Sequence, residues 1–358
     1  MNFELLKRLC EMPGISSNEG AIRELVAGEL RPFVDSLEAD VMGNLVGVRN
    51  GAPEGPRVMI AAHMDEIGFR VRFIDDRGFL RLHPVGGWDA RALFAQRVRV
   101  HGFGGQALPG TLMPASKPKH LLTDKEASHP LKIESFFVDL GLPAEEVRKQ
   151  VEVGDMVTMD RTCERMGELV VSKSLDNRLS VYILIEALRK LQRKPLAVTV
   201  LAVATTQEEV GLRGATAAAF ELRPDIGLAL DVTLAVDIPG TEADEQVTRL
   251  GGGTAIKVSD SSLICHPKLV RHFRDVAGAN AIPYQLEILG AGGTGAGGIQ
   301  RSRGGVPSFT LSTPTRYVHT VNEAAHVRDI QAGVDLLAAY LEEAHTRSYG
   351  YAGDIGQS

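Results

Sequence analysis

The sequence is poor in cysteine, with only three such residues in 358 positions. Cys10, Cys163 and Cys265 lie far apart and form no Cys-x-x-Cys pair. A sparse, odd number of cysteines is not the framework of a disulfide-stabilised secreted domain. It indicates a reducing compartment. Because the N-terminal segment also lacks the apolar core of a signal peptide, we expect a cytoplasmic protein.

The sequence also lacks long apolar runs and a strong charge of either sign. Its longest apolar stretch, residues 196–204, is far too short to cross a bilayer. The formal net charge of -6 gives no reason to expect binding to nucleic acid or to an anionic membrane. With 44% hydrophobic and 23% charged residues the composition is that of a globular protein, and 358 residues predict two domains or one domain with a large insertion.

Two kinds of pattern divide the chain. Residues 1–67 and 164–348 alternate apolar β-branched segments with amphipathic helical ones, which predicts an α/β fold with a sheet covered by helices on both faces. One of these helices is expected over residues 324–345. Residues 68–163 are rich in glycine, proline and short alternating segments, which predicts an inserted small β-rich domain. Residues 349–358 are glycine-rich, which predicts a flexible tail.

Titratable side chains follow several predicted strands. In an open α/β sheet, ligands bind beyond the carboxyl ends of the strands, so the residues at these ends are the first candidates for a site. Seven residues lie at such ends or at the start of a helix: His63, Asp65, Asp176, Glu208, Glu209, Asp231 and His319. Each of them alone is a weak signal, and their shared position is the stronger one.

Each candidate also has an ordinary structural explanation. Asp176 fits a helix N-cap, and a single histidine such as His63 is more often a hydrogen-bonded core residue than a ligand. Glu208 and Glu209 fit a solvated helix start. However, these two residues and Asp231 directly follow apolar runs, where unpaired carboxylates would cost several kcal/mol each or would stay protonated. A pair of divalent cations removes that cost.

The donor types narrow the choice of metal. Imidazoles and carboxylates without a thiolate suit zinc, cobalt or manganese. Two adjacent ions need a bridging carboxylate, and one more carboxylate must stay free to act as a base. His63 and Asp65 are two residues apart, so in extended backbone their side chains point the same way and Asp65 can hold the imidazole.

Five motifs, taken in order, resemble those of the tetrahedral aminopeptidases. This family of co-catalytic metallopeptidases includes glutamyl, leucyl and deblocking aminopeptidases and proteins labelled endoglucanase M. The motifs are AHMDEIG (62–68), SLDNR (174–178), QEEVGLRGA (207–215), ALDV (229–232) and PTRYVHT (314–320). The resemblance runs from about residue 5 to residue 341. The string KPKHLL at 117–122 is similar to part of this family's dimerisation domain.

The resemblance implies a mixed-sheet, zinc-peptidase-like catalytic domain and a set of metal ligands. Asp176 bridges two ions. His63 and Asp231 complete one metal site, and Glu209 and His319 complete the other. The implied cofactors are two divalent ions per chain, with zinc preferred and cobalt or manganese as alternatives.

The remaining implied roles concern catalysis and assembly. Glu208 is the general base that takes a proton from a metal-bridging water, and Asp65 orients His63. The implied reaction is hydrolysis of the N-terminal peptide bond of short peptides. The implied assembly is a dimer formed through the insert, whose strand edges we expect to be exposed, and six dimers form a hollow tetrahedral dodecamer.

The sequence departs from the family at Gly295, where the usual string GGTDA is replaced by GGTGA at 292–296. The ligand set stays complete, but a loop that we expect near the active site lacks an acid. This departure keeps open a catalytically weak relative that serves as a scaffold. A di-metal amidohydrolase or deacetylase of acylated amino acids is another alternative, and the preferred N-terminal residue is left open. A glycosidase is rejected, because an imidazole-rich site is not an isolated carboxylate pair.

Overall fold

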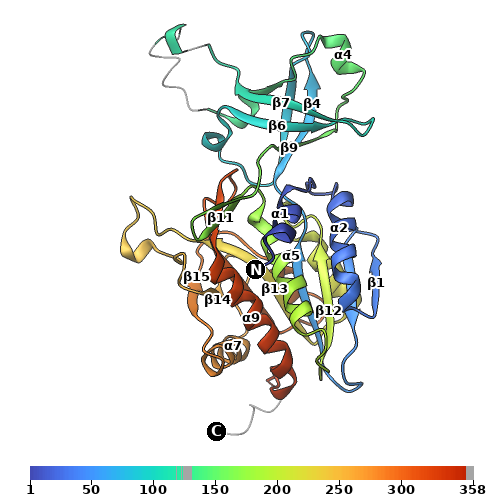
Figure 1. Ribbon diagram of the computed structural model, residues 1–358, viewed down its shortest axis with the longest axis vertical. Helices are drawn as coiled ribbons and strands as arrows, with labels where there is room; N and C mark the ends of the chain where they lie inside the picture. The colour runs from blue at the N-terminus through green and yellow to red at the C-terminus, as the bar shows by residue number, and fades with distance from the viewer. Residues whose placement is uncertain (118, 122, 124–130, 352–358) are drawn as a thin grey trace.

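The computed structural model describes residues 1–117, 119–121, 123 and 131–351. The string at 117–122 therefore lies partly, and the expected tail at 349–358 mostly, outside the described residues. The chain forms a larger unit of sheet and helices and a smaller barrel, which stands above it in Figure 1. None of the described helices is long and apolar enough to span a membrane.

Eleven described strands form one mixed sheet. They are β1 (Ser36–Ala39), β2 (Leu45–Arg49), β3 (Arg57–His63), β10 (Glu164–Met166), β11 (Leu169–Ser172), β12 (Thr199–Thr205), β13 (Ile226–Leu234), β14 (Thr254–Ser259), β15 (Tyr284–Ile288), β16 (Ser308–Arg316) and β17 (Glu323–His326). The main order is β1-β2-β12-β3-β13-β16-β17-β11-β10, and β14 pairs with β16 and β15. The central strands β12, β3, β13 and β16 are parallel, so their carboxyl ends meet at one edge of the sheet.

Helices cover both faces of this sheet, as the sequence predicts. They are α1 (Phe3–Glu11), α2 (Gly20–Leu30), α5 (Leu175–Lys190), α6 (Arg213–Leu222), α7 (Pro267–Ala279), α8 (Gly295–Gln300) and α9 (Val327–Glu343). Strand β3 illustrates why two faces are needed. Its residues Val58, Ile60 and Ala62 pack in the core under α1, α2, α5, α7 and α9, while Met59 and Ala61 pack under α6 and α8. Since neighbouring side chains of a strand point to opposite faces, this continuous apolar run is buried on both sides.

The insert folds as a closed barrel with its own core. Its strands are β4 (Gly68–Ile74), β5 (Leu80–Val85), β6 (Gln96–His101), β7 (Ala107–Pro114), β8 (Phe136–Asp139) and β9 (Met156–Met159), in the order β4-β5-β8-β7-β6-β9. The helix α4 (Ala144–Arg148) packs on it through Val147. Alternation in β6 buries Val98 and Val100. The β-rich prediction is confirmed, but the expectation of exposed edges is wrong, because the described barrel strands pair in a ring.

Short 3-10 turns connect these elements: η1 (Arg31–Phe33), η2 (Ala90–Leu93), η3 (Lys119–Leu121), η4 (Ile133–Ser135), η5 (Ala243–Glu245) and η6 (Ala344–Thr346). Before η2, Trp88 stacks on Phe69 with ring centroids 4.9 Å apart, and its Nε1 donates a hydrogen bond to the Gly68 carbonyl at 3.0 Å. Trp88 is therefore part of the insert's packing.

Candidate metal centre

The predicted site residues converge at the carboxyl edge of the parallel strands. Strand β3 ends at His63, β13 carries Asp231, and the first turn of α5 carries Asp176. Asp65 follows β3 directly, Glu208 and Glu209 follow β12, and His319 follows β16. The structure brings all seven candidates together: His63, Asp65, Asp176, Glu208, Glu209, Asp231 and His319.

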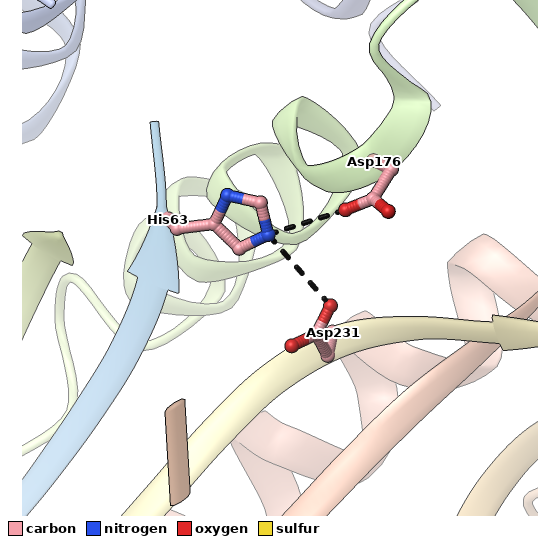
Figure 2. A group of neighbouring side chains, drawn as sticks. All are labelled: His63, Asp176 and Asp231. Carbon is pink, nitrogen blue, oxygen red and sulfur yellow. Dashed lines mark ion pairs between the residues drawn. The ribbon is translucent and has the colours of Figure 1, made fainter. Parts of the chain in front are cut away.

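The first group of potential ligands is His63, Asp176 and Asp231, whose donor atoms all lie within 4.8 Å of one another. Figure 2 shows the three side chains pointing toward one another from β3, α5 and β13. The Nε2 atom of His63 lies 3.2 Å from Oδ1 of Asp176 and 3.9 Å from Oδ1 of Asp231. All three residues are buried, and the group is held by two strands of the sheet and by the start of α5.

The second group shares Asp176 and adds Glu209 and His319. The Nε2 atom of His319 lies 3.3 Å from Oδ2 of Asp176 and 3.5 Å from Oε2 of Glu209. Asp176 thus directs Oδ1 to one imidazole and Oδ2 to the other, which is the geometry of a bridging carboxylate.

The donor set fits two divalent ions. Oδ1 of Asp176 and Oε1 of Glu209 are buried and have no hydrogen-bond partner in the described part of the chain. Buried carboxylate oxygens without partners are costly unless a cation binds them. Imidazole nitrogens and carboxylate oxygens are the donors that zinc, cobalt and manganese accept.

The electrostatics of the cluster agree with this fit. Burial raises the pKa of Asp231 to about 8, and burial together with neighbouring carboxylates raises the pKa of Glu208 well above its ordinary value. Burial lowers the pKa of His319, but Asp176 and Glu209 outweigh it and raise that pKa to about 12. The negative charges are thus crowded enough to hold protons, and cations would take the place of these protons.

Asp65 contacts both His63 and the segment that carries Glu208 and Glu209. Nδ1 of His63 lies 3.0 Å from the backbone carbonyl of Asp65 and 3.4 Å from its Oδ1. A proton on Nδ1 is therefore donated to the carbonyl, which leaves Nε2 free to bind a metal. The Asp65 carboxylate instead accepts hydrogen bonds from the backbone N–H of Glu208 at 3.1 Å and of Glu209 at 3.2 Å, and from Ser16 Oγ at 2.6 Å.

Sequence reasoning missed Glu323, which is buried at the start of β17. Its Oε2 accepts a hydrogen bond from the backbone N–H of Asp176 at 2.9 Å, and its Oε1 accepts one from that of His319 at 2.8 Å. It therefore ties together the backbone of two potential ligands. The available signal was an acid inside a buried apolar segment directly after the PTRYVHT motif.

Gly295 lies deeper than the sequence suggests. It starts α8, it is buried, and a Cβ atom there would lie 3.3 Å from Cβ of Ala215 and 3.9 Å from Cβ of Ala229. Gly292 and Gly293 line the cavity at the metal centre, whereas Gly295 is not among its described lining residues. The loop that we expected near the active site does reach it at residues 292–293. Position 295, where the family's usual acid is missing, is not part of the described cavity wall.

The barrel also reaches the second group of ligands. The segment between β5 and η2 passes so close that a Cβ atom on Gly87 would lie 3.3 Å from Nδ1 of His319. At Gly86, where φ is +84°, a Cβ atom would lie 2.4 Å from Cγ2 of Ile67 and 3.3 Å from Oε2 of Glu209. Because neither glycine has a side chain, the insert can approach His319 and Glu209 without displacing them.

A cavity of about 420 Å³ opens at the two groups. Besides His63, Asp176, Glu208, Glu209, Asp231 and His319, it is lined by uncharged residues of four segments. They are Leu212, Val232, Thr233, Leu234, Leu289, Ala291, Gly292, Gly293 and Val318.

Comparison with known proteins agrees with this geometry. The sequence profile of the family described as M42 glutamyl aminopeptidase matches residues 43–336. The chain belongs to the M42 peptidases. The predicted resemblance, the fold class and the enzyme class, a metallo-aminopeptidase, are thereby confirmed. M42 peptidases are metal-dependent, which agrees with the donor set.

Individual relatives cover nearly the whole chain. A putative aminopeptidase of Acetivibrio thermocellus is 40% identical over 336 residues, which are 94% of this chain and 97% of the relative. The structure of an aminopeptidase from the archaeon Desulfurococcus kamchatkensis has a TM-score of 0.92 at 38% identity and covers 99% of this chain and 98% of its own. The TET1 peptidase of Pyrococcus horikoshii, which can assemble into a tetrahedron or a large octahedral shell, has a TM-score of 0.84 at 32% identity, with 95% of this chain and 99% of its own covered.

Proposed function

We propose that this M42 peptidase hydrolyses the N-terminal peptide bond of short peptides with two divalent ions per chain. The observation that carries the proposal is Asp176, whose two oxygens face different imidazoles at 3.2 and 3.3 Å. His63 and Asp231 would complete one metal site with it. Glu209 and His319 would complete the other. Zinc is the preferred ion, with cobalt or manganese as alternatives.

The ions, when bound, polarise the scissile carbonyl and lower the pKa of water. Glu208 is suited to act as the base, because it lines the cavity and belongs to neither group of ligands. Its Oε2 lies 3.8 Å from Nε2 of His63, and Asp65 fixes its backbone. Glu208 takes a proton from water as the oxygen bonds to the carbonyl carbon, and it then gives that proton to the leaving amine as the carbon–nitrogen bond breaks.

The choice of the chain end is part of the proposal. Carboxylates that line the cavity favour a free ammonium or amine over an acetylated end. Asp65 is not suited to this contact, because its carboxylate is fully buried and already accepts three hydrogen bonds. We expect stepwise release of single residues, with N-acetylated and folded substrates spared.

The scaffold alternative loses its motivation, because Gly295 lies outside the cavity wall and the ligand set is complete. A free and an N-acetylated version of one decapeptide, digested with metal-loaded enzyme and followed by mass spectrometry, tests the remaining alternatives. We expect a ladder from the free peptide only. Equal cleavage of both versions, or internal fragments first, would contradict the aminopeptidase proposal, and preferential deacetylation would favour the amidohydrolase.

We also propose the assembly and its domains. The catalytic domain comprises residues 1–67 and 164–348, and residues 68–163 form a dimerisation domain. Six dimers would build a hollow tetrahedral dodecamer, an architecture related to the shells described for the Pyrococcus horikoshii relative. The barrel supports a contact role, since Phe73, Phe94 and Phe103 are each more than half exposed on it. Light scattering that found a monomer at micromolar concentration would refute the assembly, and a stable dimer would refute only the shell.

A cytoplasmic location completes the proposal. All three cysteines are free and buried, which suits a reducing compartment. Cell fractionation of the source organism would test it, and an extracellular protein would contradict it.

A further inference from the structure

One wall of the cavity has a chemistry that the hydrolytic reaction does not explain. Beyond the six residues assigned to metal binding and catalysis, its described lining is uncharged and mostly aliphatic. The aliphatic side chains come from the end of β13, from the segment after β15, and from the segments that carry Glu209 and His319. The largest are Leu212, Val232, Leu234, Leu289 and Val318.

Two charged residues near Thr233 of this wall, Lys257 and Glu287, form an ion pair with each other. Lys257 is fully buried and forms ion pairs with Glu287 and, at 3.6 Å, with Asp260. Thr233, the polar residue in the wall, donates its hydroxyl proton to Oε1 of Glu287 at 2.6 Å. The Lys257 ammonium is therefore not presented to a substrate carboxylate, and Glu287, which is also fully buried, is not presented to a substrate ammonium.

We infer that this wall, made of Leu212, Val232, Leu234, Leu289 and Val318, receives the first side chain of the substrate and selects an uncharged, apolar residue such as leucine or methionine over glutamate or lysine. A charged side chain would lose its water there without gaining a partner, whereas an aliphatic one gains by burial. The inference rests on the proposed aminopeptidase function, and it differs from the glutamyl activity in the family's description.

The direct test uses the full-length, metal-loaded enzyme and coumarin amides of leucine, methionine, glutamate and lysine. We expect kcat/KM for the leucine and methionine amides to exceed that for the glutamate and lysine amides by at least about tenfold. Equal or faster hydrolysis of the glutamate or lysine amide would overturn the inference while leaving the aminopeptidase proposal intact.

A pair of neighbouring substitutions locates the effect. Leu289→Lys places an ammonium in the wall, and Ile288→Lys places one next to it on a side chain that is 65% exposed and outside the described lining. The first variant should raise the ratio of glutamate to leucine hydrolysis by about tenfold or more, and the second should leave it unchanged. Equal ratios in both variants would overturn the assignment of the wall. Leu234→Lys, at a residue that is 38% exposed, replaces the first variant if Leu289→Lys does not fold.

A binding measurement separates the two hypotheses. Free leucine should raise the melting temperature of the metal-loaded protein more than equal concentrations of glutamate or lysine do. If no amide is hydrolysed but leucine still stabilises the protein most, the proposed function fails and the apolar wall stands. If glutamate or lysine stabilises the protein most, the wall is wrongly assigned.

Discussion

The two halves of the metal centre are built in different ways. His63 and Asp231 belong to β3 and β13, two strands of the central sheet, and their side chains are 3% and 8% exposed. Glu209 and His319 lie in segments that follow strands, and the His319 side chain is 34% exposed. His319 has a φ of +64°, which is uncommon for a residue with a side chain and must be held by its neighbours.

The supports of the two halves differ as well. The sheet half is held by paired strands and by the Asp65 carbonyl at Nδ1 of His63. The other half depends on a hydrogen bond that the backbone N–H of His319 donates to Glu323, and on the close approach of Gly87 from the barrel. We therefore expect the ion at His63 and Asp231 to bind more tightly than the ion at Glu209 and His319.

The largest effect is expected from Asp176→Ala, which removes the residue shared by both halves. The variant should lose both ions and all measurable turnover, because each half loses one carboxylate oxygen. Elemental analysis of the purified variant checks this. Retention of both ions would contradict the bridging role and would make the two halves independent.

Glu208→Gln should lower turnover by at least about a hundredfold and leave both halves occupied, because it removes the proposed base and keeps the size of the side chain. Its neighbour supplies the matched variant, since Glu209→Gln should instead lose the ion of the half that contains His319. Metal content and kcat measured side by side decide the assignment, and a Glu208→Gln variant with near-normal kcat would show that it is wrong.

Glu323→Gln should weaken the half that contains His319 more than the other half, by about ten- to a hundredfold in metal affinity. The amide keeps one acceptor where the carboxylate has two, so the backbone of Asp176 or of His319 loses its hydrogen bond. Competition with a chelator reports the two affinities, and Glu342→Gln on the surface of α9 serves as the control. Equal weakening of both ions would mean that Glu323 acts through Asp176 alone.

The smallest effect is expected from Gly87→Ala. Its new methyl group would stand 3.3 Å from Nδ1 of His319, so a shift of a few tenths of an ångström should weaken that ion only a few-fold. Gly28→Ala in α2, where nothing lies within 4 Å of the added atom, is the matched control. Titration of metal-free protein with zinc compares the two, and identical affinities would show that the barrel does not support this half.

The two halves also differ in how well they could be predicted from the sequence. His63 and Asp231 follow apolar runs that local pattern alone identifies as strands. Their convergence was then expected, because ligands bind beyond the carboxyl ends of the strands in an open α/β sheet. Glu323 was hidden because residues 324–345 were expected to be one helix, whereas the chain forms β17 up to His326 and starts α9 at Val327. A short strand there pairs with β11 and β16, and pairing with distant strands leaves no local pattern.

The barrel shows the same limit. Its alternating segments predict strands, but closure depends on β4 pairing with β9 across more than eighty residues of sequence. The role of Asp65 was predicted only in part, because the backbone geometry that gives its carbonyl to His63 and its carboxylate to the next motif exists only in the folded chain.

The position of Gly87 couples two equilibria, the binding of a metal ion and the association of chains, that are usually measured apart. It belongs to the barrel, where a second copy of the chain is proposed to dock, and it borders a proposed ligand of one ion. Any docking that moves this segment changes the affinity for that ion by some factor. Thermodynamic reciprocity then requires that filling the same half changes the association constant of the chains by an equal factor, so metal supply and particle size become linked variables.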